Sequence, residues 1–292
     1  PDEFAPGTIT CVPPYASGQV YYTVDLKAGV EYALKVTGTV KAYYFRSAAS
    51  CQPAAMSADC SSHLAHRGGV LVEGSATLVP KSSQRYTIVV DWLSTALSEL
   101  FTLSVVSRPL PTLQVPASGL ELDFETSGGG LASTGDWQWG QLSWKGGYCG
   151  TPPALDQGHA PAQKGMWATV LDGCLETGAN DQGTCLTGST VRADDSVLSF
   201  NLALPASWTR ATLEWWEHID LSKGRAEVWV DDVFDEATQV CHAVQQSTTW
   251  RRRTIDLSAH VGDTVHVAFH LMNARWGSGA GWYIDALAVK GQ

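Results

Sequence analysis

DTVHVAFHLMNARWGSGAGWYIDALAVK, residues 263–290, gives the clearest indication of the fold class. In its first half, threonine, histidine and alanine alternate with an apolar set, which is Val265, Val267, Phe269 and Leu271. This period of two is typical of a β-strand with one apolar face. Three closely spaced glycines then predict a loop, and residues 282–289 resume as a second strand rich in aromatic and branched side chains. The stretch therefore predicts a closing hairpin in an all-β protein.

One acidic residue stands out in the second of these strands. Asp285 is in phase with Leu287 and Val289, so we expect its side chain on the same apolar face. A carboxylate in such a place needs a partner, because burying an unpaired charge is costly. Asp285 is accordingly the first candidate for a site.

The composition indicates room for two domains and a surface unsuited to nucleic acid. The chain has 292 residues, 44% of them hydrophobic, and a net charge of -10. Residues 1–108 hold 8 basic and 8 acidic side chains, and residues 109–292 hold 11 and 21, so the whole excess (11 − 21 = −10) lies in the second half. Such a surface disfavours a nucleic-acid partner. No apolar run approaches the roughly 18 residues of a membrane helix, so we expect no membrane insertion.

The cysteines indicate an oxidising compartment. Seven cysteines accompany only three methionines, and their spacing fits neither a zinc site nor a redox motif. We therefore expect a secreted or cell-surface protein. Pairing within domains would join Cys51–Cys60, Cys174–Cys185 and Cys149–Cys241, with Cys11 left over. The sequence leaves both the connectivity and the fate of Cys11 open.

The first half of the chain consists of short apolar runs separated by turn signals. These predict strands at 20–26, 31–36, 39–45, 69–79, 84–90 and 100–106. Residues 1–108 are therefore predicted to form a small β-sandwich. Three prolines without a usable period then mark residues 109–118 as a semi-rigid linker.

The second half, residues 119–292, has the same all-β character. Strands are predicted at 120–125, 165–173, 196–204, 211–218, 225–230 and 252–257, before the closing hairpin. No long amphipathic helix competes with them. An antiparallel sandwich is the expected architecture.

Both halves resemble known families. In the first, YTVDLKAGVEYALKV (22–36), RYTIVV (85–90) and FTLSV (101–105) resemble the bacterial pre-peptidase C-terminal (PPC) domain, a β-sandwich found beside secreted peptidases. The second half is similar to MAM domains and equally to the MAM-like jelly-roll modules of immune-inhibitor-A-type secreted metallopeptidases. The motifs are DFE (123–125), DW (136–137), GMWATVLDG (165–173), LEWW (213–216), IDLS (255–258) and GWYID (281–285). The resemblance implies a concanavalin-like or galactose-binding-like jelly roll.

A calcium site is predicted where the two ends of this jelly roll meet. In such folds the first and last strands commonly lie side by side, which would bring Asp123 and Glu125 near Asp285. Three carboxylates repel one another unless a cation or protons intervene. Calcium, together with backbone carbonyls near Gly165, would satisfy them, and related modules often carry one structural calcium there. The alternative is that Asp123 and Glu125 face water while Asp285 accepts backbone hydrogen bonds.

Aromatic residues in loops form a second candidate site. Exposed rings could stack on sugars or anchor a protein partner, and the candidates are Trp137, Trp139, Trp144, Tyr148 and Trp276. Packing over the edge of the sandwich is the equally weighted alternative. Acidic residues at 231–236 are expected to form a solvated loop, because they lack the ligand spacing and turn glycine of an EF-hand. Asp172, Asn180 and Asp181 are at most a weak ion site.

No catalytic constellation is recognisable. His63 and His66 lack the glutamate and helical context of a metallopeptidase motif, and there is no nucleophile elbow or phosphate loop. Glu214 and Glu217 are three residues apart on a predicted strand, which places them on opposite faces. A glycosidase needs two carboxylates converging on one bond.

The sequence thus predicts a non-catalytic accessory region of a larger secreted bacterial protein, possibly a metallopeptidase. It would adhere to carbohydrate or to cell-surface and extracellular proteins through loops on a calcium-stabilised scaffold. The alternatives are a secreted hydrolase acting on polysaccharide or protein, and a purely structural spacer.

Overall fold

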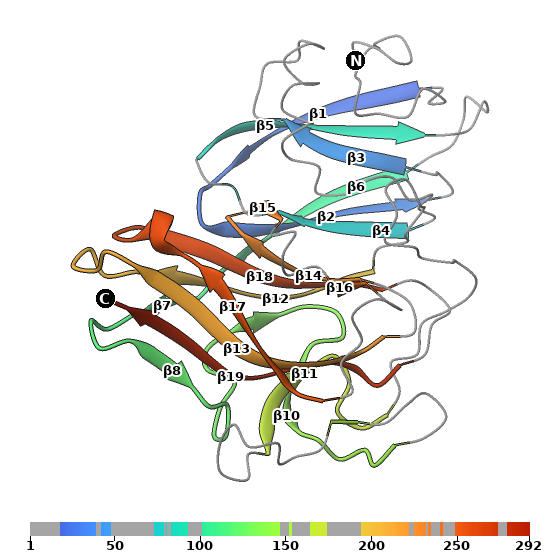
Figure 1. Cartoon of the computed structure of the whole chain (residues 1–292). Helices are drawn as coiled ribbons and strands as arrows, with labels where there is room; N and C mark the ends of the chain where they lie inside the picture. Colours follow the sequence, from blue (N-terminus) through green and yellow to red (C-terminus); the bar gives the residue numbers. More distant parts are fainter. Residues whose placement is uncertain are drawn as a thin grey trace. The chain divides into compact units, whose positions relative to one another are not determined.

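The computed structural model is all-β and separates into two compact units (Figure 1). It describes residues 18–38, 42–47, 73–78, 80, 83–92, 101–146, 152–153, 164–173, 194–221, 225–231, 233–234, 240–241, 249–273 and 279–292. The first unit comprises Pro1–Pro109, Leu186–Asp194 and Asp231–Val233, and the second comprises Leu110–Cys185, Asp195–Val230 and Phe234–Gln292. Within the described residues, no helix has the length and apolar character needed to cross a membrane.

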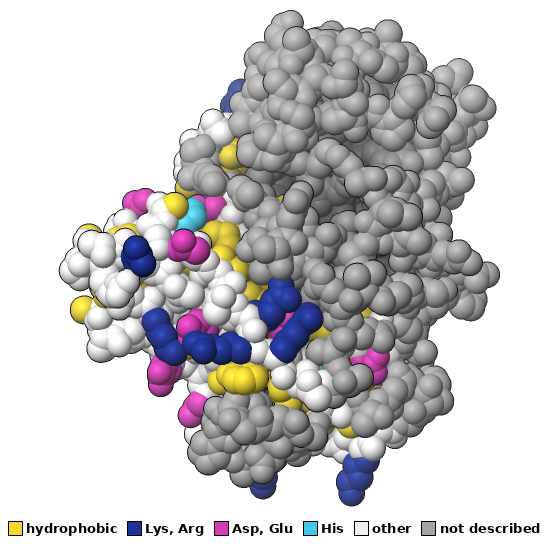
Figure 2. Space-filling model, in the orientation of Figure 1, with side chains coloured by type: hydrophobic (Ala, Val, Ile, Leu, Met, Phe, Trp, Pro, Cys, Tyr) yellow, Lys and Arg dark blue, Asp and Glu magenta, His cyan; other side chains and the backbone are white. Residues whose placement is uncertain are grey.

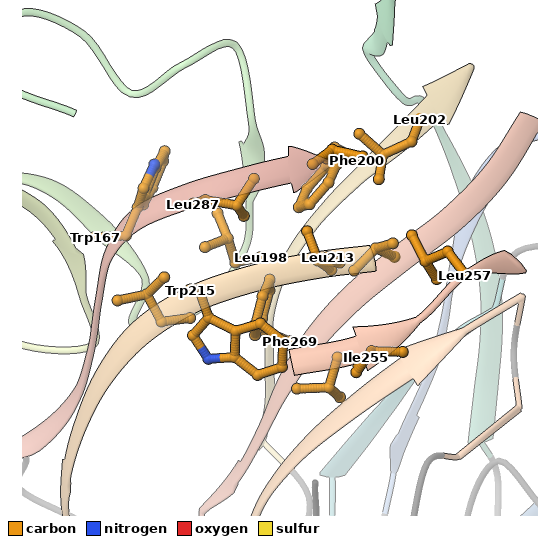
Figure 3. Close-up of a cluster of buried hydrophobic side chains, with 14 of the residues drawn as sticks. Trp167, Leu198, Phe200, Leu202, Leu213, Trp215, Ile255, Leu257, Phe269 and Leu287 are labelled. Atoms are coloured by element: carbon orange, nitrogen blue, oxygen red, sulfur yellow. The ribbon is translucent and has the colours of Figure 1, made fainter. Parts of the chain in front are cut away.

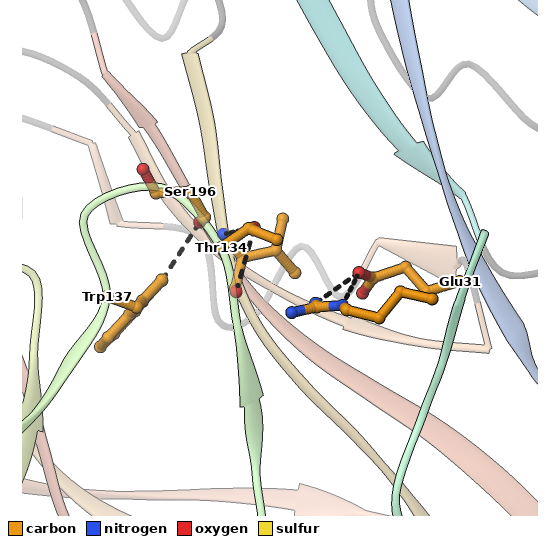
Figure 4. Close-up of polar contacts among 6 residues, drawn as sticks. Glu31, Thr134, Trp137 and Ser196 are labelled. Carbon is orange, nitrogen blue, oxygen red and sulfur yellow. Dashed lines mark hydrogen bonds and ion pairs between the residues drawn. The ribbon is translucent and has the colours of Figure 1, made fainter. Parts of the chain in front are cut away.

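Two three-stranded antiparallel sheets make up the described part of the first unit. Their orders are β1-β5-β3 and β4-β2-β6. The strands are β1 (Gly18–Leu26), β2 (Val30–Gly38), β3 (Ala42–Ser47), β4 (Glu73–Leu78), β5 (Gln84–Trp92) and β6 (Phe101–Pro109). Glu31 on β2 is buried, and the Nε of Arg108, its cross-strand partner on β6, donates to Glu31 Oε1 at 2.8 Å (Figure 4). All six strands overlap the predicted ones.

The second unit is a sandwich of a six-stranded and a seven-stranded sheet. The first has the order β10-β11-β19-β13-β17, with β8 paired to β19, and the second has the order β15-β14-β18-β12-β7, with β16 on β14 and β9 on β12. The six-stranded sheet contains β8 (Leu120–Leu122), β10 (Gln138–Gln141), β11 (Gly165–Ala168), β13 (Ala211–Asp220), β17 (Arg251–Asp256) and β19 (Gly281–Gly291). The seven-stranded sheet contains β7 (Thr112–Gln114), β9 (Ala132–Ser133), β12 (Asp194–Ala203), β14 (Arg225–Val230), β15 (Val233–Phe234), β16 (Val240–Cys241) and β18 (Thr264–Asn273). The all-β sandwich prediction is confirmed for this unit.

The core of the second unit lies between these two sheets (Figure 3). Leu198 and Phe200 on β12 and Phe269 on β18 meet Leu213 and Trp215 on β13, and all five are fully buried. The ring of Phe269 packs edge-on against that of Trp215, with 5.3 Å between centroids. The alternation read from the sequence at 265–271 therefore does point its apolar set into a core.

The prediction of a closing hairpin, however, is wrong. Both of its strands form, as β18 and β19, but β18 pairs with β14 in the seven-stranded sheet and β19 pairs with β13 in the six-stranded sheet. The two strands therefore lie in different layers of the sandwich. Alternation and a glycine-rich loop specify two strands and a turn, but the choice of pairing partner depends on which sheet buries each apolar face.

Part of the predicted linker lies in the sandwich. β7 pairs in parallel with β12, and the neighbouring Val115 is buried against the core. Prolines suit this position because β7 is the last strand of its sheet, where one edge of the backbone needs no ladder partner.

Candidate functional site

The outer face of the six-stranded sheet, directed away from the core, carries the candidate site. On β13 the side chains alternate, so that Leu213 and Trp215 enter the core while Thr212, Glu214 and Trp216 lie on the outer face. The cross-strand partners continue this grid. Glu214 pairs with Thr254 on β17 and Ala288 on β19, and Ala288 pairs in turn with Glu121 on β8.

A shallow trough of about 330 Å³ runs over this grid. Its lining comprises Glu121, Leu122, Asp123, Glu214, Trp215, Trp216, Arg252, Ala286, Leu287, Ala288 and Lys290. The small side chain of Ala288 leaves the floor low between Glu121 and Glu214, which are two strand spacings apart, about 9.5 Å between backbones. The indole of Trp216 stands at one end. The trough therefore offers carboxylates on opposite walls, with Glu121 and Asp123 on one side and Glu214 on the other, and the aromatic ring of Trp216.

Charges of both signs alternate along the trough. Lys290 Nζ donates to Glu214 Oε2 at 2.8 Å, and the guanidinium of Arg252 pairs with the same oxygen. The hydrogen bond from Arg252 is the main reason that the pKa of Glu214 lies below its ordinary value, so this carboxyl is ionised at neutral pH. Figure 2 shows such Lys, Arg, Asp and Glu side chains interspersed on the surface. They leave hydrogen-bonding groups of both kinds facing a ligand.

The other end of the outer face is apolar. Met166 and Ala168 on β11, Tyr283 on β19 and Trp250 form a buried cluster, and Trp216 and Trp144 pack against it. His218 lies in this region with its ring 5.8 Å from that of Tyr283 and 6.2 Å from that of Trp250. Burial, reinforced by the nearby Arg251, lowers the pKa of His218 to about 4, so the imidazole is neutral at physiological pH.

Asp285 lies at the boundary between these two regions, and its predicted orientation is wrong. The β13 and β19 register slips by one residue beside Ala286, whose φ is +46°. This β-bulge reverses the alternation, so Ile284 and Leu287 both enter the core although they are three residues apart. Asp285 consequently shares the outer face with its cross-strand partner Trp216, not the inner face with Leu287 and Val289.

The three predicted calcium ligands are close enough to influence one another electrostatically. β8 does pair with β19, as expected for first and last strands. Asp285 is only 1% exposed, and its Oδ1 accepts a hydrogen bond from Ala286 N at 2.7 Å. Burial is the main reason that the pKa of Asp285 is raised to about 7; the backbone hydrogen bond from Ala286 opposes this shift, and repulsion from Glu125 and Asp123 adds to it.

Near Gly165 the backbone presents amide groups to Glu125, not the carbonyl groups expected for a calcium site. Glu125 Oε1 accepts from the amides of Lys164 and Gly165 at 2.8 and 3.3 Å, where carbonyl groups for a metal were expected. Gly165 is required there, because a Cβ would lie 2.2 Å from the carbonyl oxygen of Phe124. Within the described part of the chain, no three Asp, Glu, His or Cys side chains are grouped as metal ligands. Calcium binding stays a prediction.

The predicted aromatic set does not form one exposed surface. Trp137 is buried at 4% exposure, donates from Nε1 to the carbonyl oxygen of Ser196 at 3.1 Å (Figure 4) and packs against Trp282. It is a core residue, and its selection as a ligand-binding residue was wrong. Trp144 is half-buried against the apolar cluster. Trp139 is 40% exposed, and its Nε1 donates to the carbonyl oxygen of Phe124 at 2.9 Å.

Several predicted sites fall outside the described residues. These are Tyr148, Trp276, Asn180, Asp181, His63, His66 and six cysteines, namely Cys11, Cys51, Cys60, Cys149, Cys174 and Cys185. The backbone of Cys241 lies in β16, and of the acidic run 231–236 only Asp231, Val233 and Phe234 are described. The three disulfides stay predictions.

Glu217, on the inner face, is surrounded by donors. Its Oε2 accepts hydrogen bonds from the indoles of Trp215 and Trp282 at 3.1 and 3.2 Å. Its Oε1 accepts from Arg251 Nε at 2.9 Å and lies 3.7 Å from Arg253 Nε. The sequence prediction that Glu214 and Glu217 face opposite ways is confirmed, and the two carboxylates cannot converge on one substrate bond.

The trough itself was missed at the sequence level. Its signal was present in ATLEWWEHID, residues 211–220, where apolar residues alternate with Thr212, Glu214 and Trp216. Those polar positions have the pattern of any solvated sheet face. Only the pairing with β8, β17 and β19 shows that Ala288 lies between two carboxylates.

Comparisons with known proteins find similar solved structures but show no family for this chain. No family model matches the chain, and no curated protein matches it. Among solved structures it is similar to the C-terminal CBM6 of LamC from Zobellia galactanivorans, with 11% identity over 59% of this chain and 98% of that chain and a TM-score of 0.31. It is similar to a family 35 carbohydrate binding module from Clostridium thermocellum (12%, 60% and 100%, TM-score 0.32). It is also similar to the K1 cleaved adhesin domain of Lys-gingipain from Porphyromonas gingivalis W83 (17%, 61% and 93%, TM-score 0.30). Matches at this level assign no function, and the PPC and MAM resemblances stay predictions.

Proposed function

We propose that the second unit is a non-catalytic carbohydrate-binding module and that its ligand lies in the trough of the outer face. One observation carries the proposal: the low floor at Ala288 lies between the carboxylates of Glu121 and Glu214, with the indole of Trp216 at the end. A sugar ring presents hydroxyl groups around its edge and apolar C–H groups on its faces. Carboxylates accept hydrogen bonds from the hydroxyls, and an indole packs against the ring face.

The charge state of the trough supports binding without hydrolysis. A glycosidase needs one carboxylic acid with a raised pKa close to a second carboxylate. Glu214 has a lowered pKa because Arg252 and Lys290 bond to it. Asp285 has a raised pKa but is 1% exposed and does not line the trough.

Two further expectations belong to this proposal. A calcium ion at Asp123, Glu125 and Asp285 would stiffen the wall that β8 contributes. Secretion, attachment to a larger bacterial polypeptide and adhesion to surfaces are the setting in which such a module would act.

The test is a glycan array followed by isothermal titration calorimetry on the full chain. We expect saturable binding of a neutral glycan that Trp216→Ala and Ala288→Trp each weaken at least about tenfold, because the first removes the ring and the second fills the trough. Trp139→Ala is the matched control, since Trp139 is an exposed tryptophan on the same sheet outside the trough. It should leave binding unchanged.

Other results would reject the proposal. Loss of binding in Trp139→Ala alone would show that the exposed loop tryptophans, and not the trough, bind the glycan. Turnover of a bound glycan would favour the alternative function, a secreted hydrolase. Binding only to proteins would favour a protein-directed adhesin, and no binding at all would favour a spacer. The thermal midpoint of each variant shows whether a loss reflects misfolding. Ala288→Trp is the more secure variant, because Trp216 also packs on the apolar cluster.

A further inference from the structure

A second groove adjoins the trough on the outer face. It has a volume of about 720 Å³ and a polar lining that includes Arg210 and Thr212 near the start of β13, Thr254 and Asp256 on β17, and Lys290 on β19. Thr254 and Asp256 are exposed, and Thr212 is half-buried. No apolar side chain lines it, in contrast to the trough with its indole. We call this groove the polar extension.

The trough and the polar extension form one continuous path. Lys290 lines both. The register explains why, since Thr212 lies between Asp256 and Lys290, and the next outward residue of β13, Glu214, lies between Thr254 and Ala288. Outward residues of a strand repeat about every 6.8 Å, so the path from Trp216 to Arg210 is about 20 Å long. That length exceeds a single sugar ring several times.

The charges along this path disfavour a polyanionic ligand. Four acidic side chains (Glu121, Asp123, Glu214 and Asp256) accompany three basic ones (Arg210, Arg252 and Lys290), giving 3 − 4 = −1. Arg252 and Lys290 are already paired with Glu214, and Arg210 is close enough to Asp256 to help lower its pKa, after the larger effect of hydrogen bonds from Ser258. Few positive groups therefore remain for sulfate or carboxylate substituents.

We propose that the trough and the polar extension are one site for an uncharged linear polysaccharide, which lies along β13 with several consecutive sugar units bound. This inference rests on the proposed function and adds the class and the length of the ligand. The aromatic end at Trp216 holds one sugar by its face. The threonine hydroxyls of the polar extension bond to the units that follow, and each additional unit adds contacts without adding charge.

Calorimetry with oligosaccharides of increasing length tests it. The probes are cello-, laminari-, manno- and xylo-oligosaccharides, each from monosaccharide to hexasaccharide, with heparin and polygalacturonate as polyanions. In the series that binds, we expect affinity to rise about tenfold or more between disaccharide and tetrasaccharide. Thr212→Val should lose about tenfold for the hexasaccharide and keep its disaccharide affinity, because Thr212 lies two outward positions along β13 from Trp216 and only the distant units contact its hydroxyl.

Controls separate this inference from the proposed function. Thr264→Val, an exposed threonine on the other sheet, should change neither affinity. An affinity independent of length, or a Thr212→Val variant that weakens disaccharide and hexasaccharide equally, would overturn the extended site while leaving a carbohydrate module. Tighter binding of heparin or polygalacturonate would overturn the uncharged ligand. Binding of no carbohydrate would overturn both proposals.

Discussion

Two carboxylates on one strand, Glu214 and Glu217, show how differently the two faces of the six-stranded sheet use the same side chain. Glu217 points inward, is 1% exposed, accepts hydrogen bonds from Trp215, Trp282 and Arg251, and forms an ion pair with Arg253. Glu214 points outward and pairs with long, half-exposed cations at the side of an open trough. Glu217 stabilises the interior of the sandwich, and Glu214 remains accessible on the wall of the trough.

The difference follows from how far water can reach each carboxylate. An interior carboxylate must have its lone pairs filled by protein donors, so its partners are fixed and its removal leaves other polar groups unpaired. An outward carboxylate exchanges partners with solvent at little cost. Stability should therefore respond to the inner face and binding to the outer face, and each prediction below tests that division.

Replacing the interior carboxylate should have the largest destabilising effect. Glu217→Ala removes the carboxylate that accepts hydrogen bonds from the indoles of Trp215 and Trp282 and from Arg251, and it removes the ion pair with Arg253. We expect a loss of about 3 kcal/mol in the free energy of unfolding, measured by urea denaturation with tryptophan fluorescence.

Glu214→Ala is the matched control for Glu217→Ala. Because its ion pairs are partly solvated, we expect a loss below about 1 kcal/mol. Equal losses in the two variants would contradict the division between the faces. The same control should weaken glycan binding, whereas Glu217→Ala, where it remains folded, should not.

The ionisation of Asp285 should make stability fall as pH rises. Burial raises its folded pKa from 3.8 to about 7, so between these values the folded state binds a proton that the unfolded state has lost. In metal-free protein this contribution to the free energy of unfolding is largest below about pH 4, declines up to about pH 7 and is then absent. Asp285→Asn should remove the decline and stabilise the protein at pH 8, by at most about 4 kcal/mol. Urea denaturation from pH 4 to pH 8 measures it.

Bound calcium should reverse the loss of stability that ionisation of Asp285 causes in the metal-free protein. A cation held by Asp123, Glu125 and Asp285 favours the ionised carboxyl, so adding calcium at pH 8 should raise the thermal midpoint of the wild type and not that of Asp285→Asn. An unchanged midpoint in the wild type would reject the calcium prediction. A wild type whose stability is independent of pH in chelator would reject the raised pKa.

Replacing Ala286 in the β-bulge by glycine should have the smallest effect on the free energy of unfolding. Ala286 has a φ of +46°, a conformation that costs about 1 kcal/mol for a residue with a Cβ. Ala286→Gly should therefore stabilise the protein by up to about 1 kcal/mol in urea denaturation. Ala288→Gly, in the extended part of the same strand, is the control and should destabilise it slightly. Stabilisation by both would show that the bulge is not the cause.

Local patterns predicted most strands and some orientations. The alternation at 265–271 gave β18 and its inward face, and the odd spacing of Glu214 and Glu217 gave their opposite faces. The prediction for Asp285 failed because alternation presumes an unbroken strand, and the bulge at Ala286 inserts one residue. Trp137 was misassigned because glycine-rich surroundings resemble a surface loop, although its ring packs on Trp282 in the core.

Local spacing was enough to predict the all-β class, the positions of most strands and the face that each apolar set turns inward, because these depend on residues two positions apart. Three features emerge only from the folded chain: β18 and β19 belong to different sheets, Ala288 lies between Glu121 and Glu214, and Asp285 faces outward. Each of these depends on pairings between residues more than 35 positions apart or on a bulge that such a pairing creates. Such pairings are selected by the burial of the whole sheet, which no local spacing records.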